Sequence, residues 1–161
     1  MILGFGWCHL QSDRQIIASA NSETVDAVDA AIDAADEAMF DAFEHWLRTN
    51  GSQWVAVQFL RGLNNHKGLL TWTTSRNHRP GHVWHMLDWI AINAVGSYGV
   101  FYVHDDEDDR RVANISEGCH VDNVFRVHWL RSGNWTEAPD PYFGPVLGGL
   151  EPIHYFDRDA D

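Results

Sequence analysis

Residues 89–109 read WIAINAVGSYGVFYVHDDEDD, and this stretch decides the fold. It predicts a helix that ends near Val95, a turn at residues 96–99, a buried strand at residues 100–104 and then five consecutive carboxylates. Gly96 suits the left-handed conformation that ends many helices, because it lacks a Cβ. Charged side chains are seldom buried, so the acids are expected at the solvent-exposed end of the strand. These acids are Asp105, Asp106, Glu107, Asp108 and Asp109.

The rest of the chain supplies elements that pack around this unit. Apolar residues at steps of three and four predict an amphipathic helix over residues 25–47. A second helix is expected over residues 82–95, because Pro80 suits a first helical turn. Residues 2–10, 53–60, 69–75, 98–104 and 123–131 are rich in β-branched and aromatic side chains and are expected to be strands. Residues 134–156 are expected to form an irregular segment over the core, and residues 157–161 a frayed end.

This element order predicts a single α+β domain over residues 1–161. In this two-layer sandwich, two helices cover one face of a four- to five-stranded, mainly antiparallel sheet in the order β-α-β-β-α-β-β. Two hairpins are expected, one from residues 53–60 and 69–75. The other joins residues 98–104 and 123–131 through a long tip.

The charge restricts the partners of this chain. Its formal net charge is −12 over 161 residues. Nucleic acids and anionic membranes are recognised by clustered Lys and Arg, so neither is expected as a partner, and a basic protein is the natural complement. Neither a membrane-spanning run nor a signal peptide is evident, which predicts a cytoplasmic protein. Cys8 and Cys119 form no metal motif and are expected as free thiols.

The acidic run after the predicted strand invites a calcium site, since calcium prefers several carboxylate ligands. The run does not fit the helix-loop-helix template, because Arg110 stands where the sixth position requires glycine. Two interpretations remain, a solvated loop and an electrostatic surface for a basic protein.

His78, His82 and His85, together with Asp88, form the best candidate metal or catalytic cluster, because residues three apart share a helix face. They match no established ligand frame. We therefore expect no metal and no cofactor, and a small enzyme using His78, His85 and Asp88 remains an alternative function.

The chain contains eight tryptophans. Most of the following six are expected on buried faces: Trp7, Trp46, Trp54, Trp72, Trp84 and Trp129. Trp89 and Trp135 are the two candidates for partner contacts, since tryptophan is enriched at binding hot spots. Trp89 and Ile92 interrupt the polar side of the second helix, and we expect the first helix to cover both.

Several short motifs occur together in a fixed order and resemble those of one protein family. They are Gly6-Trp7, Asn77-His78-Arg79, Trp89-Ile90, Gly96-Ser97-Tyr98-Gly99, the acidic run with Tyr102 to His104 before it, residues 125–130, residues 140–145 and residues 149–152. The combination is similar to the immunity protein 7 family of bacterial polymorphic toxin systems. The glycine-flanked turn followed by the acidic run is its most specific part.

The resemblance implies a small cytoplasmic α+β protein that binds and neutralises a cognate toxin domain and is not an enzyme. Asn77, His78, Arg79, Gly96, Ser97, Tyr98 and Gly99 are then the motif residues, and the acidic run, Trp89 and Trp135 are the candidate toxin-binding residues. The physical interpretation agrees, because an acidic surface suits a basic toxin. A generic interaction domain, which would bind without inhibiting, is the other alternative. The sequence leaves the oligomeric state open.

Overall fold

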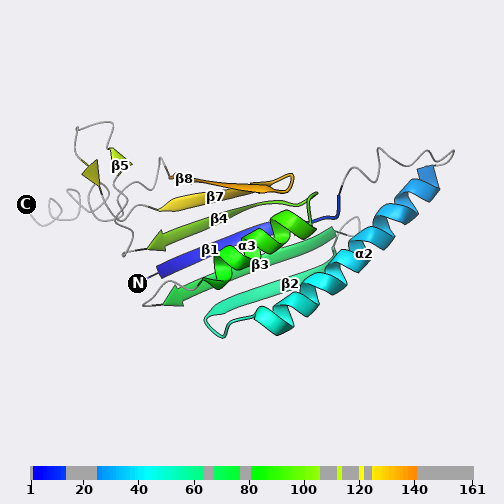
Figure 1. Ribbon diagram of the computed structural model, residues 1–161, viewed down its shortest axis with the longest axis horizontal. Coiled ribbons are helices and arrows are strands. Elements are labelled where there is room, and N and C mark those ends of the chain that lie inside the picture. Colours follow the sequence, from blue (N-terminus) through cyan, green and yellow to red (C-terminus); the bar gives the residue numbers. More distant parts are fainter. Residues whose placement is uncertain are drawn as a thin grey trace, which may run out of the picture.

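The structure, a computed structural model, describes residues 2–13, 25–63, 67–76, 81–105, 112–113, 120–121 and 125–140. Two helices and eight strands lie in these ranges (Figure 1). The helices are α2 (Val25–Asn50) and α3 (His82–Asn93). The strands are β1 (Ile2–Leu10), β2 (Val55–Leu63), β3 (Lys67–Arg76), β4 (Tyr98–Asp105), β5 (Val112–Ala113), β6 (His120–Val121), β7 (Arg126–Arg131) and β8 (Asn134–Pro139).

Six of the strands form one antiparallel sheet in the order β2-β3-β1-β4-β7-β8, and β5 and β6 form a separate pair. The predicted α+β fold is therefore confirmed, with one or two more strands than expected. Both predicted hairpins are present, as β2 with β3 and as β4 with β7. β1 lies between β3 and β4, so the first strand of the chain joins the two hairpins into one sheet.

β8 corrects one prediction. Residues 134–139 were expected to be irregular, but they pair with β7 in a hairpin whose connection is Ser132-Gly133. Both connecting residues have positive φ, 51° and 73°. Two consecutive positive φ values give a turn whose twist matches that of the flanking strands, so a two-residue connection suffices. The rest of the expected irregular segment lies outside the described residues.

Both helices lie on the same face of the sheet (Figure 1). α2 buries Met39, Phe40 and Phe43, and α3 contributes Val83, Met86, Leu87 and Ile90 to the same core. Residues 26–35 of α2 are exposed or only half-buried, and this half of the helix extends past the strands. Within the described residues, no helix is long and apolar enough to cross a membrane.

Trp89 joins the two helices. Its ring centroid lies 5.1 Å from that of Phe43 and 6.2 Å from that of Trp46, both on α2. Contact with the first helix is thus confirmed for Trp89. For Ile92 the prediction is wrong, because its side chain is 74% exposed. The two residues are three apart, but only Trp89 is long enough and oriented to reach α2.

The turn between α3 and β4 holds the end of β1. The Ser97 hydroxyl accepts a hydrogen bond from the backbone N–H of Gln11 at 3.0 Å and donates one to the backbone carbonyl of Gln11 at 3.3 Å. The next amide, that of Ser12, donates to Asp36 Oδ1 of α2 at 2.6 Å. Ser97 and Asp36 are both buried, so these bonds tie β1 to both helical units away from water.

The left-handed cap predicted for Gly96 is wrong. Among the described residues, the glycines with positive φ are Gly62 and Gly133. Glycine is needed at position 96 for another reason, because a Cβ there would overlap the carbonyl oxygen of Ser12. Glycine is needed at position 99 for the same reason, because a Cβ there would overlap the backbone of β1. The glycines of this motif therefore permit close backbone approach.

Candidate interaction surface

The sheet face opposite the helices carries a set of large apolar side chains. Within each strand, alternate residues point to this face, which we call the open face. Its large apolar side chains are between 40% and 49% exposed and comprise Leu3, Phe5, Trp7, Trp54, Leu60 and Trp129. So many large exposed apolar side chains on one face of a sheet are unusual on a protein that acts alone and indicate an interaction site.

The aromatic rings of the open face support one another. Phe5 of β1 stacks on Tyr102 of β4, with ring centroids 5.2 Å apart. Trp7 meets Tyr98 edge-on at 6.2 Å, and Tyr98 in turn stacks on His9 at 5.1 Å. These cross-strand pairs hold each ring in one orientation. The surface is therefore ordered before any partner arrives.

A hollow of about 330 Å³ opens on the same face. Its lining comes from β1, β3 and the start of β2, and includes Leu3, Phe5, Trp54 and Thr73. Trp54 is fixed at its rim through the backbone, because its carbonyl accepts a hydrogen bond from Thr74 Oγ1 at 2.8 Å. The hollow is large enough to accept one side chain of a partner protein.

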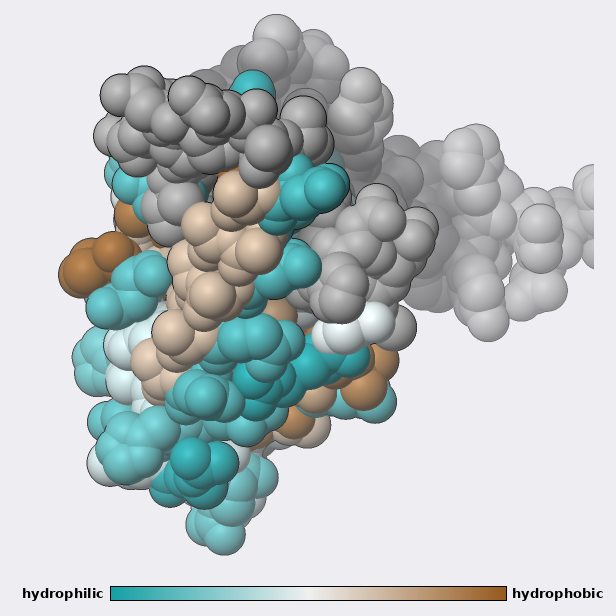
Figure 2. Space-filling view, turned by 90° about the vertical axis from the view of Figure 1, so that its right-hand side faces the viewer, coloured by the Kyte–Doolittle hydropathy of each residue, from teal (hydrophilic) through white to brown (hydrophobic). Residues whose placement is uncertain are grey.

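The open face differs from the rest of the molecule in charge. Within the bounds of the six strands, its described side chains include Arg131 but no carboxylate. The chain as a whole carries a formal net charge of −12. Much of that charge lies on α2. From the side of the molecule at which α2 begins, Figure 2 shows a band of moderately hydrophobic residues between hydrophilic ones. The negative charge of α2 and the apolar open face thus occupy different sides of the sheet.

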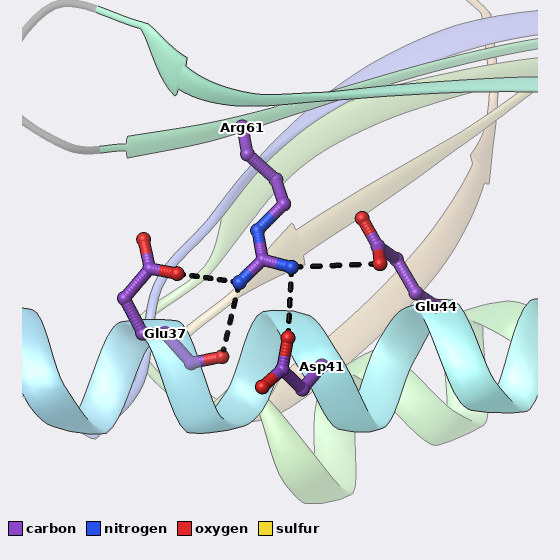
Figure 3. A network of polar contacts seen from close by, with 4 residues as sticks. All are labelled: Glu37, Asp41, Glu44 and Arg61. Atoms are coloured by element: carbon purple, nitrogen blue, oxygen red, sulfur yellow. Dashed lines mark hydrogen bonds and ion pairs between the residues drawn. The ribbon is translucent and has the colours of Figure 1, made fainter.

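Part of the α2 charge is balanced within the chain. Arg61 of β2 contacts Glu37, Asp41 and Glu44, at 2.5, 2.8 and 3.4 Å (Figure 3). The hydrogen bond that the Arg61 guanidinium donates to the Asp41 carboxylate is the main reason why the pKa of Arg61 is raised. Since one cation serves three carboxylates, this cluster still carries a net charge of about −2.

The predicted acidic run begins differently from expectation. Asp105 closes β4 opposite Ile2 and is 4% exposed, so its expected position at the solvent-exposed end of the strand is wrong. It lies on the helix-covered face, where alternation along β4 places it. Asp106, Glu107, Asp108 and Asp109 lie outside the described residues.

The predicted division of the tryptophans is partly wrong. Trp72 is buried and Trp46 and Trp84 are half-buried, as expected, whereas Trp7, Trp54 and Trp129 are exposed on the open face. The two candidate contact residues are half-buried on the helix side. Trp89 packs on α2, and Trp135 Nε1 donates to Asp88 Oδ1 at 2.9 Å.

A signal for the open face was present in β1. Leu3, Phe5, Trp7 and His9 alternate with Gly4, Gly6 and Cys8, so large side chains point one way and small ones the other. The small side faces the core, because Trp72 crosses beneath Gly4 and Gly6 and fills the space that a Cβ would need. A pattern of size, rather than of polarity, marked the exposed side.

Only part of the histidine cluster lies within the described residues. His82 and His85 are exposed on α3, Asp88 accepts the hydrogen bond from Trp135, and His78 lies outside the described residues, as do Asn77 and Arg79. Within the described residues, no group of three or more His, Cys, Asp and Glu side chains is placed to hold a metal. A second hollow, of about 600 Å³, is lined by other residues, among them Asp13, Tyr98 and Arg131.

Comparison with known proteins adds one finding. A family model described as Immunity protein 7 matches residues 1–152 of the chain. No curated protein and no solved structure gives a match. The matched range contains both helices and all eight strands, so the similarity extends over the open face as well as the helical side.

Proposed function

Because the chain belongs to the immunity protein 7 family, we propose that it binds a cognate bacterial toxin domain in the cytoplasm and neutralises it by covering its active site or binding surface. The match over residues 1–152 carries this proposal. Proteins of such families are in general not enzymes, so the toxin is inhibited because the bound chain covers its active site or binding surface. The ordered apolar face supports the proposal, because it offers a surface that a partner can bury.

The acidic run has a separate role in this proposal. Asp106, Glu107, Asp108 and Asp109 steer a basic toxin toward the complex through their charge. Asp105 is buried and takes no direct part. Trp89 and Trp135 offer less surface than the open-face tryptophans, since each is partly covered within the chain.

Co-expression tests the proposal. The C-terminal domain encoded immediately upstream of this gene is expressed in a host with this chain, with an empty vector or with an unrelated immunity protein. We expect growth arrest in both controls and growth with this chain. Arrest in all three cultures would contradict the proposed function.

Titration of the purified toxin domain separates inhibition by binding from enzymatic inactivation. Toxin activity should fall in proportion to the added chain and vanish at one equivalent. Loss of activity at a small fraction of one equivalent would favour the enzyme alternative. Binding without any loss of activity would favour the generic interaction domain.

A further inference from the structure

The open face is a large apolar surface whose occupant has to be identified. Three occupants are possible in principle: residues 141–161 of the chain itself, a second copy of the chain, and another protein. The described residues favour one of them through exposure, order and charge.

Exposure and order show that the surface is available. Trp7, Trp54 and Trp129 are 42%, 46% and 41% exposed within the full chain. The Trp7 ring needs little rearrangement to bind, because it packs edge-on against Tyr98, and the backbone of Trp54 is held by the hydrogen bond from Thr74. Ordered aromatic side chains lose little conformational entropy on binding, which is the property of rigid anchors in protein interfaces.

Charge discriminates between the occupants. Two copies that met through their open faces would bring together two chains that each carry a net charge of −12, and these would repel each other. A positively charged partner would instead gain from the same field. A nucleic acid is disfavoured, although bases stack on aromatic rings, because Arg131 is the one Lys or Arg among the described side chains of this face and the overall field repels phosphate.

We propose that the open face, centred on Phe5, Trp7 and Trp54, is the surface on which the toxin docks, through a protein patch that is apolar at its centre in a domain of net positive charge. This inference rests on the proposed function. The hollow at Leu3, Phe5 and Trp54 takes an apolar anchor residue of the toxin. Charge then governs how fast the complex forms, and the open face governs how long it lasts.

Substitutions of the anchors test this division. Trp54→Ser removes a side chain that precedes β2 and leaves both backbone hydrogen bonds of Trp54 in place. Trp7→Thr keeps a residue that favours strands. For each variant we expect the dissociation constant for the purified upstream toxin domain to rise about thirtyfold, mainly through faster dissociation.

Ile92→Thr is the matched control. Ile92 is the most exposed large apolar residue of the described chain, at 74%, and it lies on α3, on the opposite side of the sheet. Its substitution should change toxin affinity less than about twofold. Thermal melts of all three variants confirm that each folds. Equal affinities for wild type, Trp54→Ser and Trp7→Thr would overturn the inference.

Hydroxyl-radical footprinting identifies the occupant without any variant. In the full chain alone, Trp7, Trp54 and Trp129 should oxidise at low and high concentration, and the toxin domain should protect them while Ile92 continues to oxidise. Protection in the isolated chain at every concentration would assign the face to the chain's own residues. Protection that appears only at high concentration would assign it to a second copy.

The footprint also separates this inference from the proposed function. Rescue of growth together with oxidation of all three tryptophans in the complex would leave the immunity function intact and move the interface elsewhere. Absence of both rescue and binding would remove the proposed function, and the inference with it.

Discussion

Gly96 shows how one missing methyl group positions a whole turn. A Cβ at this position would overlap the Ser12 carbonyl, between Asp36 of α2 and the buried Ser97 hydroxyl. The obstructing atom belongs to the backbone of Ser12, which cannot move without breaking the hydrogen bonds to Ser97 and Asp36. The sequence predicts a turn at this motif, but the close approach that requires glycine does not show in it, because the obstructing residue Ser12 is more than eighty positions away.

We expect Gly96→Ala to lower the free energy of unfolding by about 3 kcal/mol, through overpacking and loss of buried hydrogen bonds. Gly81→Ala is the matched control. Gly81 has a φ of −58°, and a Cβ there would meet its nearest neighbour at 3.6 Å. The control should be neutral or more stable by about 0.5 kcal/mol. Urea denaturation of both variants measures the difference, and equal stabilities would contradict the close approach.

Cys8 predicts a dependence of stability on alkaline pH. Burial raises the pKa of its thiol far above the ordinary value of 9.0, so the folded state keeps the proton where the unfolded state loses it. Below pH 9 the two states bind the proton equally and the thiol has no effect on stability. Above pH 9 the thiol ionises in the unfolded state only, which stabilises that state. The free energy of unfolding should therefore fall by about 1.4 kcal/mol per pH unit because of this group.

The measurement compares wild type with Cys8→Ala by urea denaturation between pH 8 and pH 11. The variant should be less stable at pH 8, because a buried side chain is shortened. Its stability should then fall less steeply with pH than that of wild type. Parallel curves would show that the thiol is not held protonated in the folded state.

At the scale of elements, the patterns that repeat along one segment were the predictable ones. The apolar stripe of α2 and the turn composition between β2 and β3 depend on near neighbours. β8 was missed because Ser132-Gly133 lacks the Asn or Asp that usually marks a two-residue turn. The central place of β1 also could not be read from its own residues, because it depends on pairing with β3 and β4.

The contact between α2 and β2 gives an element-scale prediction. Arg61 joins three carboxylates of α2 and lies 5.6 Å from the centroid of the Phe40 ring. We expect Arg61→Met to lower the free energy of unfolding by about 1 kcal/mol at low salt, because the acids then repel one another, and by less at high salt. The expected loss of stability is small because solvent screens the charges of this exposed network.

Arg48→Met is the matched control, since Arg48 lies exposed in the last turn of α2 and interacts there with the helix end. It should cost less than about 0.5 kcal/mol. Urea denaturation at two salt concentrations checks both variants. A loss for Arg61→Met that does not depend on salt would mean that packing on Phe40, rather than charge, stabilises this contact.

At the scale of the molecule, the layer arrangement decides which predicted site residues can meet a partner. The sequence reveals that Trp7 and Trp54 are apolar, but it does not reveal that both helices pack on the same face. With one face covered by helices, alternate residues of each strand point to the other face, and in this chain several of them are aromatic. The size alternation of β1 marks which of its sides is exposed, but the extent of the open face across six strands depends on the packing of both helices on one side of the sheet.

The charge of the molecule gives the last prediction, which concerns the acidic run. If Asp106, Glu107 and Asp108 steer a basic toxin, their replacement by Asn and Gln should lower the association rate at low salt. The effect should vanish as salt rises, because the screening length falls from about 10 Å at 0.1 M to about 3 Å at 1 M. The dissociation rate should change little, since the apolar face holds the complex together.

A control with the same change in net charge separates local steering from the overall field. Asp26, Asp29 and Asp33 lie on the half of α2 that precedes the Arg61 network, and their replacement by Asn also removes three charges. Stopped-flow binding of wild type and both variants to the toxin domain across a salt series gives the rates. A larger loss for the acidic run assigns it to the approach path of the toxin. Equal losses mean that only total charge matters, and a larger loss for α2 places the approach on the helical side, away from the open face.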